Sequence, residues 1–270
     1  MPAGKRGPNL LRLMLTLIAV AMIESPVLAD GQPAARPGSP GANLAEPERA
    51  LFTRKDLVLA AVASGVVLGV ASEDLWLRRR LLAPRSSVQR DLARTFQPLG
   101  NGVVVLPALV AGYGFARLTG RPELTAAVTR IGISAGVAGA CAVALKRVVG
   151  RPRPSETPGD SDELFPFSSH ESFPSGHTTF AFALATAIDR ETESAWVPWV
   201  AYPAAALVAW SRVHDDDHWT SDVVAGAALG VWTAGKAEAF MRRRPRATGR
   251  IGLRFSTDPP GIALALMPQR

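Results

Sequence analysis

The 270-residue sequence has little cysteine and few aromatic residues, and each shortage excludes a class of protein. A single cysteine, Cys141, leaves no partner for a disulfide framework and no set of thiolates for a zinc site. Only two tyrosines are present, and no segment has the Tyr-, Thr- and Ile-rich composition that is typical of strands. Hydrophobic residues, mostly Ala, Val and Leu, make up 47% of the chain, which excludes a disordered protein. The composition therefore predicts closely packed helices and an all-α fold.

The chain is strongly basic, with a formal net charge of +7. Its Lys and Arg residues fall in separate clusters between apolar stretches, without the basic stripe and interleaved aromatic residues of a nucleic-acid binder. We therefore expect no nucleic-acid partner. Anionic lipid or a phosphorylated substrate explains this distribution of charge better.

Residues 1–29 have the pattern of an export signal. Three basic residues precede an uncharged apolar run at 13–23, and residues 27–29 offer a cleavage site. An uncleaved membrane anchor is the alternative. Residues 30–50 are rich in Pro, Gly and Ala and are interpreted as a linker.

Residues 51–241 alternate uncharged apolar runs with charged connectors, which predicts a bundle of about six core helices. Small residues recur inside the runs, as close helix packing in a bilayer favours. Only two runs reach the roughly 18 residues of a confident membrane span, so the others are either short spans or buried helices of a soluble bundle. We interpret the domain as membrane-embedded. The runs cover residues 57–72, 95–116, 131–145, 172–188, 194–211 and 223–235.

Arginines that follow the last run indicate a cytoplasmic end there, which would place the connectors at 150–172 and 212–222 outside. A cleaved signal is incompatible with six full spans in this orientation. Three arrangements therefore stay open: an uncleaved anchor, one helix lying on the membrane surface, or a bundle exported to the periplasm. The expected location is a bacterial-type cell envelope, either the inner membrane with the site on its periplasmic side or the periplasm itself.

Residues 242–270 form a basic tail whose pattern changes period. Apolar residues alternate with smaller or polar ones on both sides of a Pro/Gly turn at 258–261, which predicts a small β-hairpin. A frayed tail is the alternative.

All four histidines lie within residues 170–218, in or beside the connectors. The same connectors carry fixed cations, among them Arg151. Imidazoles and cations that meet at one end of a helix bundle suit an anion, above all phosphate. The cations of this group are Lys146, Arg147, Arg151, Arg153 and Arg212.

Two of the connectors predict an anion clamp. Lys146 ends one apolar run, and Arg153 follows in a Pro-rich extended stretch, so the two can converge on a ligand. An interfacial basic anchor is the plainer interpretation of these cations. Ser175 is a good helix N-cap and Gly176 allows close backbone approach, so the first-turn N–H groups can face an anion. His177 then lies where it can protonate a leaving oxygen, although a plain capped helix with a surface histidine is the alternative.

A third connector contains His218 and Asp222, four residues apart at an expected helix start and therefore on one face. A carboxylate that accepts from one ring nitrogen prepares the other as a nucleophile or base. His214 and His218 have the same spacing around three aspartates and are a rival metal site. We disfavour a metal because three adjacent aspartates cannot all face one point on a helix. They are interpreted as a solvated turn.

Together these segments read Lys146-x6-Arg153-Pro154, Pro174-Ser175-Gly176-His177 and Ser211-Arg212-x5-His218-x3-Asp222. They resemble the three-part signature of the type-2 phosphatidic acid phosphatase superfamily, which includes bacterial acid phosphatases and vanadium-dependent haloperoxidases. The resemblance covers roughly residues 55–240 and retains every marked position.

The resemblance implies a helical phosphatase that uses no cofactor and no metal ion. Lys146, Arg153 and Arg212 would bind the phosphoryl oxygens with the Ser175 hydroxyl and the Gly176 amide. His218 would attack phosphorus and form a phosphohistidine, Asp222 would orient it, and His177 would act as general acid.

We expect a substrate that is a lipid phosphate monoester or diphosphate, such as phosphatidic acid or a polyprenyl diphosphate. Three alternatives remain: a soluble exported acid phosphatase of broad specificity that takes small phosphate esters, a vanadate-dependent haloperoxidase, and a non-catalytic phosphate-binding membrane protein.

Overall fold

The computed structural model describes residues 52–81, 86–192, 194–243, 249–257 and 260–268. The proposed signal or anchor at 1–29 and the linker at 30–50 lie outside the described residues. The chain divides into two compact units at Glu238, and the site lies in the first.

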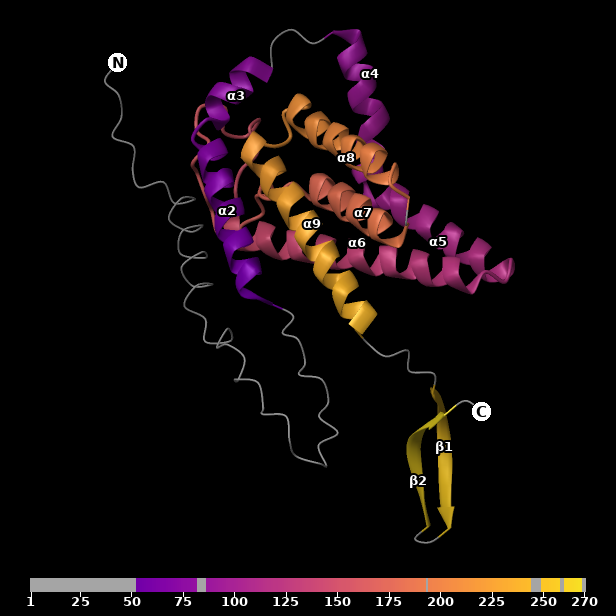
Figure 1. Ribbon diagram of the computed structural model, residues 1–270. Helices are drawn as coiled ribbons and strands as arrows, with labels where there is room; N and C mark the ends of the chain where they lie inside the picture. The colour runs from indigo at the N-terminus through magenta and orange to yellow at the C-terminus, as the bar shows by residue number, and fades with distance from the viewer. Residues whose placement is uncertain (1–51, 82–85, 193, 244–248, 258–259, 269–270) are drawn as a thin grey trace, which may run out of the picture. The chain divides into compact units, whose positions relative to one another are not determined.

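The described part of the first unit is helical, which confirms the predicted all-α fold (Figure 1). Each of the six apolar runs contributes to one long helix. The described helices are α2 (Arg54–Ala71), α3 (Asp74–Leu81), α4 (Ser87–Phe96), the 3₁₀ turn η2 (Gln97–Gly100), α5 (Gly102–Leu118), α6 (Pro122–Val149), α7 (Gly176–Glu191), α8 (Val197–His214) and α9 (Thr220–Arg243).

Local capping residues set several helix starts. The Asp56 carboxylate accepts from the Thr53 N–H at 2.7 Å at the start of α2. Ser86 and Gln89 form a reciprocal capping box at α4, with bonds of 3.2 and 3.0 Å. Asn101 accepts from the backbone at 2.9 Å at the start of α5. These bonds satisfy N–H groups that a helix start leaves without an intrahelical partner.

The structure contains two helices, α3 and α4, that the sequence analysis did not predict, and it divides one predicted helix into two parts. The arginine-rich connector after α2 forms α3 and α4, and the run at 95–116 is broken by η2 before α5 begins. The break coincides with Pro98 and Gly100, which interrupt regular helix geometry. Capping at Ser86 and Asn101 then starts new helices on either side of it.

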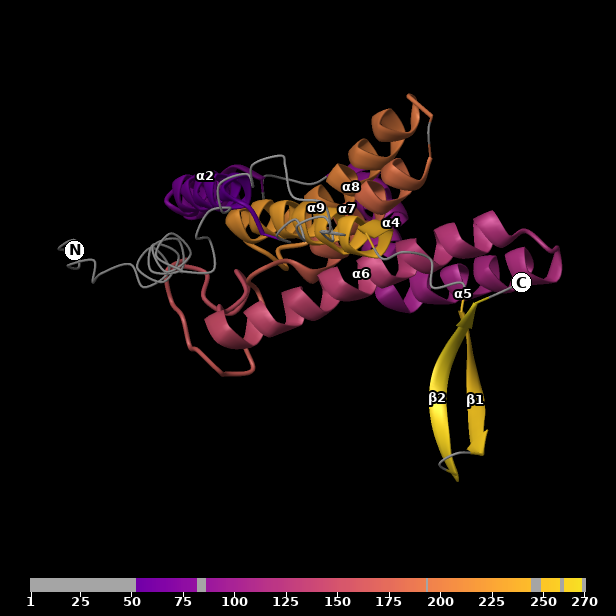
Figure 2. The ribbon, with the colours of Figure 1, turned by 60° about the horizontal axis from the view of Figure 1, so that its bottom comes forward.

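Helix α7 lies among α6, α8 and α9 in Figures 1 and 2, and the core is built around it from small side chains. Ala138, Ala183 and Ala234 join α6, α7 and α9 in one buried cluster. Ala185 and Ala205 join α7 to α8 in another. Alanine contacts let helix backbones approach closely, which explains how an Ala-rich sequence with few aromatic residues forms a dense core.

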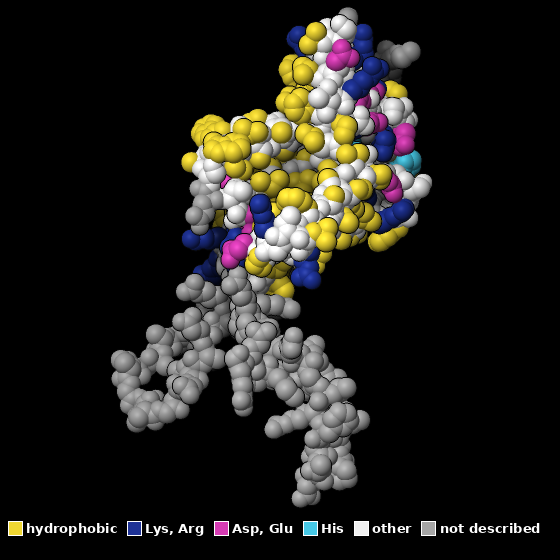
Figure 3. Space-filling view, turned by 90° about the vertical axis from the view of Figure 1, so that its right-hand side faces the viewer, with side chains coloured by type: hydrophobic (Ala, Val, Ile, Leu, Met, Phe, Trp, Pro, Cys, Tyr) yellow, Lys and Arg dark blue, Asp and Glu magenta, His cyan; other side chains and the backbone are white. Residues whose placement is uncertain are grey.

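Among the described residues, α6 alone is long and apolar enough to cross a membrane as a single helix, with a mean hydropathy of 1.6. Two bent pairs, α2 with α3 and α4–η2 with α5, would raise the number to three if each pair counted as one span. Large apolar side chains on α5 are exposed, including Val103 at 81% and Leu118 at 90%. Apolar side chains also cover much of the face shown in Figure 3 and surround a hollow there. Such surfaces are typical of contact with a membrane or a partner.

The second unit contains the predicted hairpin. Strands β1 (Gly249–Thr257) and β2 (Pro260–Pro268) pair antiparallel, with Gly249 opposite Pro268 and Thr257 opposite Pro260. The alternation of apolar residues therefore indicated the correct element.

Candidate active site

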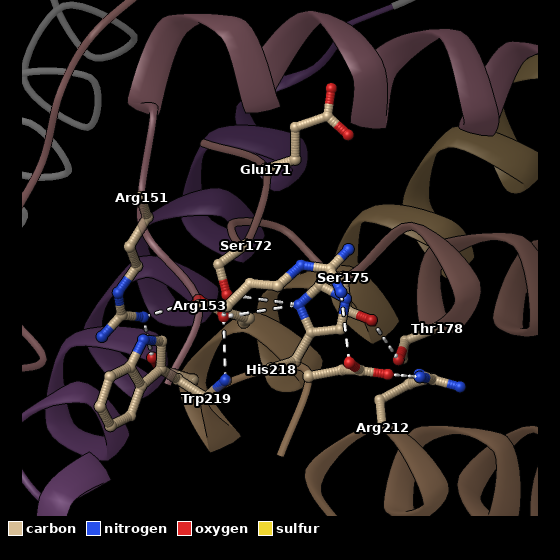
Figure 4. Close-up of polar contacts among 12 residues, drawn as sticks. Arg151, Arg153, Glu171, Ser172, Ser175, Thr178, Arg212, His218 and Trp219 are labelled. Atoms are coloured by element: carbon tan, nitrogen blue, oxygen red, sulfur yellow. Dashed lines mark hydrogen bonds and ion pairs between the residues drawn. The ribbon is translucent and has the colours of Figure 1, made fainter. Parts of the chain in front are cut away.

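Four chain segments converge at one end of the bundle: the end of α6 with the loop after it, the start of α7, the end of α8 and the start of α9 (Figure 4). They carry all eight residues that the sequence singled out. The meeting point is fixed by backbone contact, because the Ser175 N–H donates to the Asp222 carbonyl oxygen at 3.0 Å.

A glycine ends α6 and turns the chain toward the site. Gly150 adopts φ 59° and ψ 45°, the left-handed conformation that glycine accepts most readily at a helix C-terminus. A Cβ at this position would lie 1.8 Å from the Phe165 carbonyl oxygen, so no larger residue fits. Lys146 lies in the last turn of α6 and donates through Nζ to the Glu171 carbonyl oxygen. Arg153 follows the turn with its side chain 40% exposed.

The start of α7 matches the predicted N-cap position, but not the predicted capping bond. Ser175 is the N-cap, with φ −66° and ψ 113°, yet its side chain makes no bond to the helix backbone. Its buried hydroxyl instead accepts from Thr178 Oγ1 at 3.0 Å. Gly176 begins the helix with its Cα beside Lys146, and a Cβ there would lie 3.5 Å from Lys146 Cε. The lysine and the helix start therefore border one space.

His218 and Asp222 meet, although not on one helix face as the spacing suggested. Helix α9 begins at Thr220, so His218 lies before it and Asp222 lies in its first turn. The Asp222 carboxylate accepts the Trp219 N–H at 3.0 Å and the Ser172 hydroxyl at 2.5 Å. His218 Nδ1 lies 3.6 Å from Asp222 Oδ2 and 3.5 Å from Ser172 Oγ. Nδ1 thus faces the carboxylate, which leaves Nε2 for the substrate side.

Arg151 is one of the cations that the sequence placed in these connectors, and the structure pairs it with carboxylates. Its fully buried guanidinium donates to Asp222 Oδ1 at 2.6 Å and to Asp74 Oδ2 at 2.9 Å, and it lies beside Trp219 in Figure 4. Ser221 connects the same groups, because its N–H donates to Asp74 Oδ1 at 2.9 Å. Both carboxylates are completely buried and share this one cation. Arg151, held by Asp74, therefore fixes the Asp222 carboxylate through Oδ1, while Oδ2 faces His218.

Asp74, Ser172 and Ser221 were missed by the sequence analysis. Asp74 lies in α3, far from the other motifs along the chain, and no spacing signals its contact with Arg151. Ser172 lies three residues before Ser175 and is inconspicuous in a segment that contains other serines.

Three buried nitrogen atoms near the clamp lack a hydrogen-bond partner among the described residues: Nε and Nη1 of Arg212 and Nε2 of His177. Buried donors without partners are rare because each has a desolvation cost of about 1–3 kcal/mol. Their concentration beside two other cations indicates a place for an anionic ligand.

A cavity of about 300 Å³ opens at this point. Lys146, Arg153, Gly176, His177 and His218 line its polar side with Glu171. Its other side is formed by small and apolar residues of η2, α5, α6 and α7: Gly100, Gly102, Gly139, Ala142, Val143 and Phe180. Ser175, Arg212 and Asp222 are not among the residues that line it. The cavity thus joins a charged end to an uncharged wall.

The electrostatics distinguish the two histidines from the carboxylate. Burial would raise the pKa of Asp222, but the charge of Arg151 and the hydrogen bonds from His218 and Ser172 outweigh it and lower the pKa to about 2. Burial lowers the pKa of His218, so its ring is neutral and Nε2 carries a lone pair at neutral pH. Burial, followed by the charge of Arg212, lowers the pKa of His177 to about 4.

His214 and His218, whose spacing offered an alternative metal site, have other partners. Within the residues that the structure describes, no group of three or more His, Cys, Asp or Glu side chains is placed to hold a metal ion. His214 Nδ1 lies 3.1 Å from Asp215, and its ring packs at a tilt of 43° against Trp210, with centroids 4.8 Å apart. The three adjacent aspartates are also not simply a solvated turn, because each of them pairs with a different basic side chain.

Comparison with known proteins agrees with the motifs. Residues 127–246 match the PAP2 superfamily. The matched segment contains all three motifs. The resemblance stated from the three motifs is thereby confirmed at the level of the superfamily.

PAP2 relatives are found in bacteria and in fungi. A protein of Rhizobium johnstonii named lipid A 1-phosphatase is 37% identical over 130 residues, which are 45% of this chain and 48% of the relative. A Schizosaccharomyces pombe protein named probable diacylglycerol pyrophosphate phosphatase 1 is 35% identical over 166 residues, 49% of this chain and 59% of the relative. The chain thus spans about half the length of these two curated PAP2 relatives.

The PAP2 fold is also found in a solved structure. The crystal structure of a transmembrane PAP2-type phosphatidylglycerolphosphate phosphatase from Bacillus subtilis superimposes with a TM-score of 0.53 at 21% identity. The superposition covers 69% of this chain and 97% of the other. At this identity the likeness concerns the helical fold.

Proposed function

We propose that this chain is a metal-independent phosphatase that hydrolyses lipid phosphate monoesters or diphosphates through a phosphohistidine intermediate. One observation carries the proposal. Unpartnered buried nitrogen atoms of Arg212 and His177 lie at the same charged end of the bundle as Lys146, Arg153 and the neutral ring of His218. These groups are what a phosphoryl group needs for binding, attack and protonation.

In the proposed binding step, the phosphoryl oxygens are held by Lys146, Arg153 and Arg212. Ser175 and the Gly176 N–H at the start of α7 contribute further donors, because the first N–H groups of a helix have no intrahelical acceptor. The three cations offset the charge that develops on the phosphoryl oxygens in the transition state.

In the proposed chemical step, His218 Nε2 forms a bond to phosphorus while the bond to the leaving oxygen breaks. Protonated His177 gives its proton to that oxygen, and Asp222 stabilises the charge that His218 acquires. Water then attacks phosphorus, the N–P bond breaks, and the water proton returns to His177. The products are the lipid alcohol, or a lipid monophosphate from a diphosphate, and inorganic phosphate.

Lipid is the proposed substrate class because the charged end of the cavity continues into an uncharged wall. The exposed apolar side chains of α5, such as Val103 and Leu118, support operation at a membrane. The names of the two curated relatives, a lipid A 1-phosphatase and a probable diacylglycerol pyrophosphate phosphatase, point to the same class.

The proposed location is the inner membrane of a bacterial-type envelope, with the site on the periplasmic side. The exposed loop residue Ser155 offers a direct test. A Ser155→Cys variant on a Cys141→Ser background should react with a membrane-impermeant maleimide from the periplasmic side of intact spheroplasts. Labelling only after lysis would place the site on the cytoplasmic side instead.

The activity is tested by phosphate release from phosphatidic acid, a polyprenyl diphosphate and p-nitrophenyl phosphate in detergent. We expect wild type to hydrolyse at least one lipid and His218→Asn to hydrolyse none. His170→Asn is the matched control, because this histidine lies in the same connector region but pairs with Glu156 at the surface, 3.0 Å away. A phosphoprotein trapped by rapid denaturation should be present in wild type and absent from His218→Asn.

The other outcomes separate the alternatives. Release from p-nitrophenyl phosphate but never from lipid would indicate the broad-specificity acid phosphatase. Bromination of a dye with vanadate and peroxide, without phosphate release, would indicate a haloperoxidase. Phosphate binding without turnover by folded wild type would contradict the enzymatic proposal.

A further inference from the structure

The anion clamp of Lys146, Arg153 and Arg212 already contains an anionic group of this chain, the carboxylate of Asp217. Arg153 Nη1 donates to Asp217 Oδ1 at 3.2 Å, and Arg212 Nη2 donates to Asp217 Oδ2. The two arginines, labelled in Figure 4, come from different segments, the loop after α6 and the last turn of α8. One carboxylate therefore bridges the two guanidinium groups to which the proposed function assigns phosphoryl oxygens.

The turn that aims Asp217 at the clamp is held firmly. Asp216 adopts φ +61°, a left-handed conformation that aspartate tolerates better than most residues. Arg78 of α3 anchors this residue through two bonds to its carboxylate, of 2.8 and 2.6 Å. The Asp217 N–H then donates to the Arg212 carbonyl oxygen at 3.1 Å. The chain therefore folds back so that Asp217 faces Arg212 in the last turn of the preceding helix.

The two preceding aspartates have other partners. Asp215 lies 3.1 Å from His214 Nδ1, and Asp216 pairs with Arg78. Of the three, Asp217 alone contacts the clamp arginines. Its side chain is 33% exposed, so a ligand can reach the contact and replace it.

We propose that Asp217 is a resident anion of the phosphate clamp, which an incoming phosphoryl group must displace and which sets the affinity of the clamp for free phosphate. The proposal rests on the proposed function for the identity of the ligand. A carboxylate and a phosphate compete for the same guanidinium donors, because both form charge-assisted bonds with arginine. After displacement, Asp217 remains close to the bound anion and repels it. Free phosphate is thereby held weakly and leaves readily after hydrolysis.

The test compares the binding of inorganic phosphate to wild type, Asp217→Asn and Asp215→Asn by titration calorimetry in one detergent and buffer. Asp217→Asn preserves size and removes the charge. We expect it to bind phosphate about tenfold more tightly, as the removal of one partly solvated charge a few ångströms from the ligand implies. Asp215→Asn removes from the same turn a carboxylate that makes no hydrogen bond to the clamp arginines and acts on Arg212 only through its charge. Its gain in affinity should be clearly smaller than that of Asp217→Asn, because no guanidinium donor is released and the charge is partly screened by solvent and salt.

Equal affinities of wild type and Asp217→Asn would overturn the proposal, as would an equal gain in Asp215→Asn. Asp217→Ser, which is too short to bridge the arginines, should give the same gain and serves if the amide variant does not fold. Because binding is measured without turnover, the proposed function is tested separately. Tighter phosphate binding by Asp217→Asn would support the role of Asp217 as a resident anion even if wild type hydrolysed no ester. If none of these proteins bound phosphate, that role would be overturned.

Discussion

Replacing Arg151 with methionine should damage both the stability and the turnover of this protein. The guanidinium lies between two carboxylates, 2.6 Å from Asp222 and 2.9 Å from Asp74, and all three side chains are fully buried. Methionine fills a similar volume but leaves two buried carboxylates without a counter-charge. Neither carboxylate is exposed to solvent, which would otherwise screen its charge.

Two magnitudes follow from this geometry. Removing one partner of a buried ion pair destabilises a fold by about 3–5 kcal/mol, and here two anions lose the same cation. The pKa of Asp222 should rise as well, because burial raises it and the charge of Arg151 is the largest influence that lowers it to about 2. A neutral Asp222 no longer stabilises the charge on His218. We therefore expect kcat to fall on the order of 10²- to 10⁴-fold.

The assay measures chemical unfolding and kcat on a lipid phosphate in the same detergent. Arg147→Met is the matched control, because the Arg147 side chain is 55% exposed and its ion pair with Glu171, at 3.4 Å, lies at the surface. Such a surface pair contributes about 0–1 kcal/mol to stability. Adding Asp74→Asn to Arg151→Met leaves one buried carboxylate instead of two, so it should restore part of the stability and none of the turnover. This account of the network would be refuted if the free energy of unfolding of Arg151→Met were within about 1 kcal/mol of that of wild type and its kcat were unchanged.

Three further predictions concern the same site. Burial and the clamp cations lower the pKa of His177 to about 4, so in the free protein the ring loses its proton as the pH rises through about 4. Bound phosphate should raise this pKa, because the charge of the phosphate offsets those cations. NMR titration with and without vanadate measures the shift directly, and kcat should persist to higher pH than kcat/KM. Gly226→Ala would place a Cβ 2.7 Å from the Ser175 carbonyl oxygen and should cost about 1–3 kcal/mol in unfolding free energy and raise KM, whereas Gly132→Ala, with no atom within 4 Å of its Cβ, should leave both unchanged. Ser172→Ala removes a 2.5 Å bond to the carboxylate that faces the nucleophile and should lower kcat about tenfold with little change in KM, and an unchanged kcat would argue against that role.

Much of the fold could be predicted from the sequence, because its signals are local. Uncharged runs rich in small residues predicted the six long helices, and the change of period near residue 250 predicted the hairpin. The short helices α3 and α4 could not be predicted in this way. Their arginine-rich sequences have the composition of a connector, and Arg78 and Asp74 find their partners in segments more than 70 residues away.

The candidate site shows the same division between local and distant information. The motifs identified the residues that meet at the end of the bundle, and the family resemblance assigned Arg153 to the ligand, but no sequence signal assigned a role to Arg151. By composition alone Arg151 and Arg153, which are separated by one proline, are equivalent. The structure separates them by burial, since one guanidinium is fully buried against two carboxylates and the other is 40% exposed at the cavity. Only the partners that the fold supplies distinguish a cation that supports the carboxylate from one that can bind phosphate.

The aspartates at 215–217 extend this argument to the anions. Three identical neighbours are indistinguishable in the sequence, yet a single left-handed residue, Asp216, held by Arg78 from α3, sends each side chain to a different partner. The carboxylate that reaches the clamp is therefore selected by a contact with a helix 138 residues earlier in the chain. If that contact positions Asp217, then Arg78→Met should weaken the bridge between Arg153 and Arg212 and tighten phosphate binding in the same direction as Asp217→Asn. An unchanged phosphate affinity in Arg78→Met, beside a gain in Asp217→Asn, would show that the turn holds its shape without this anchor.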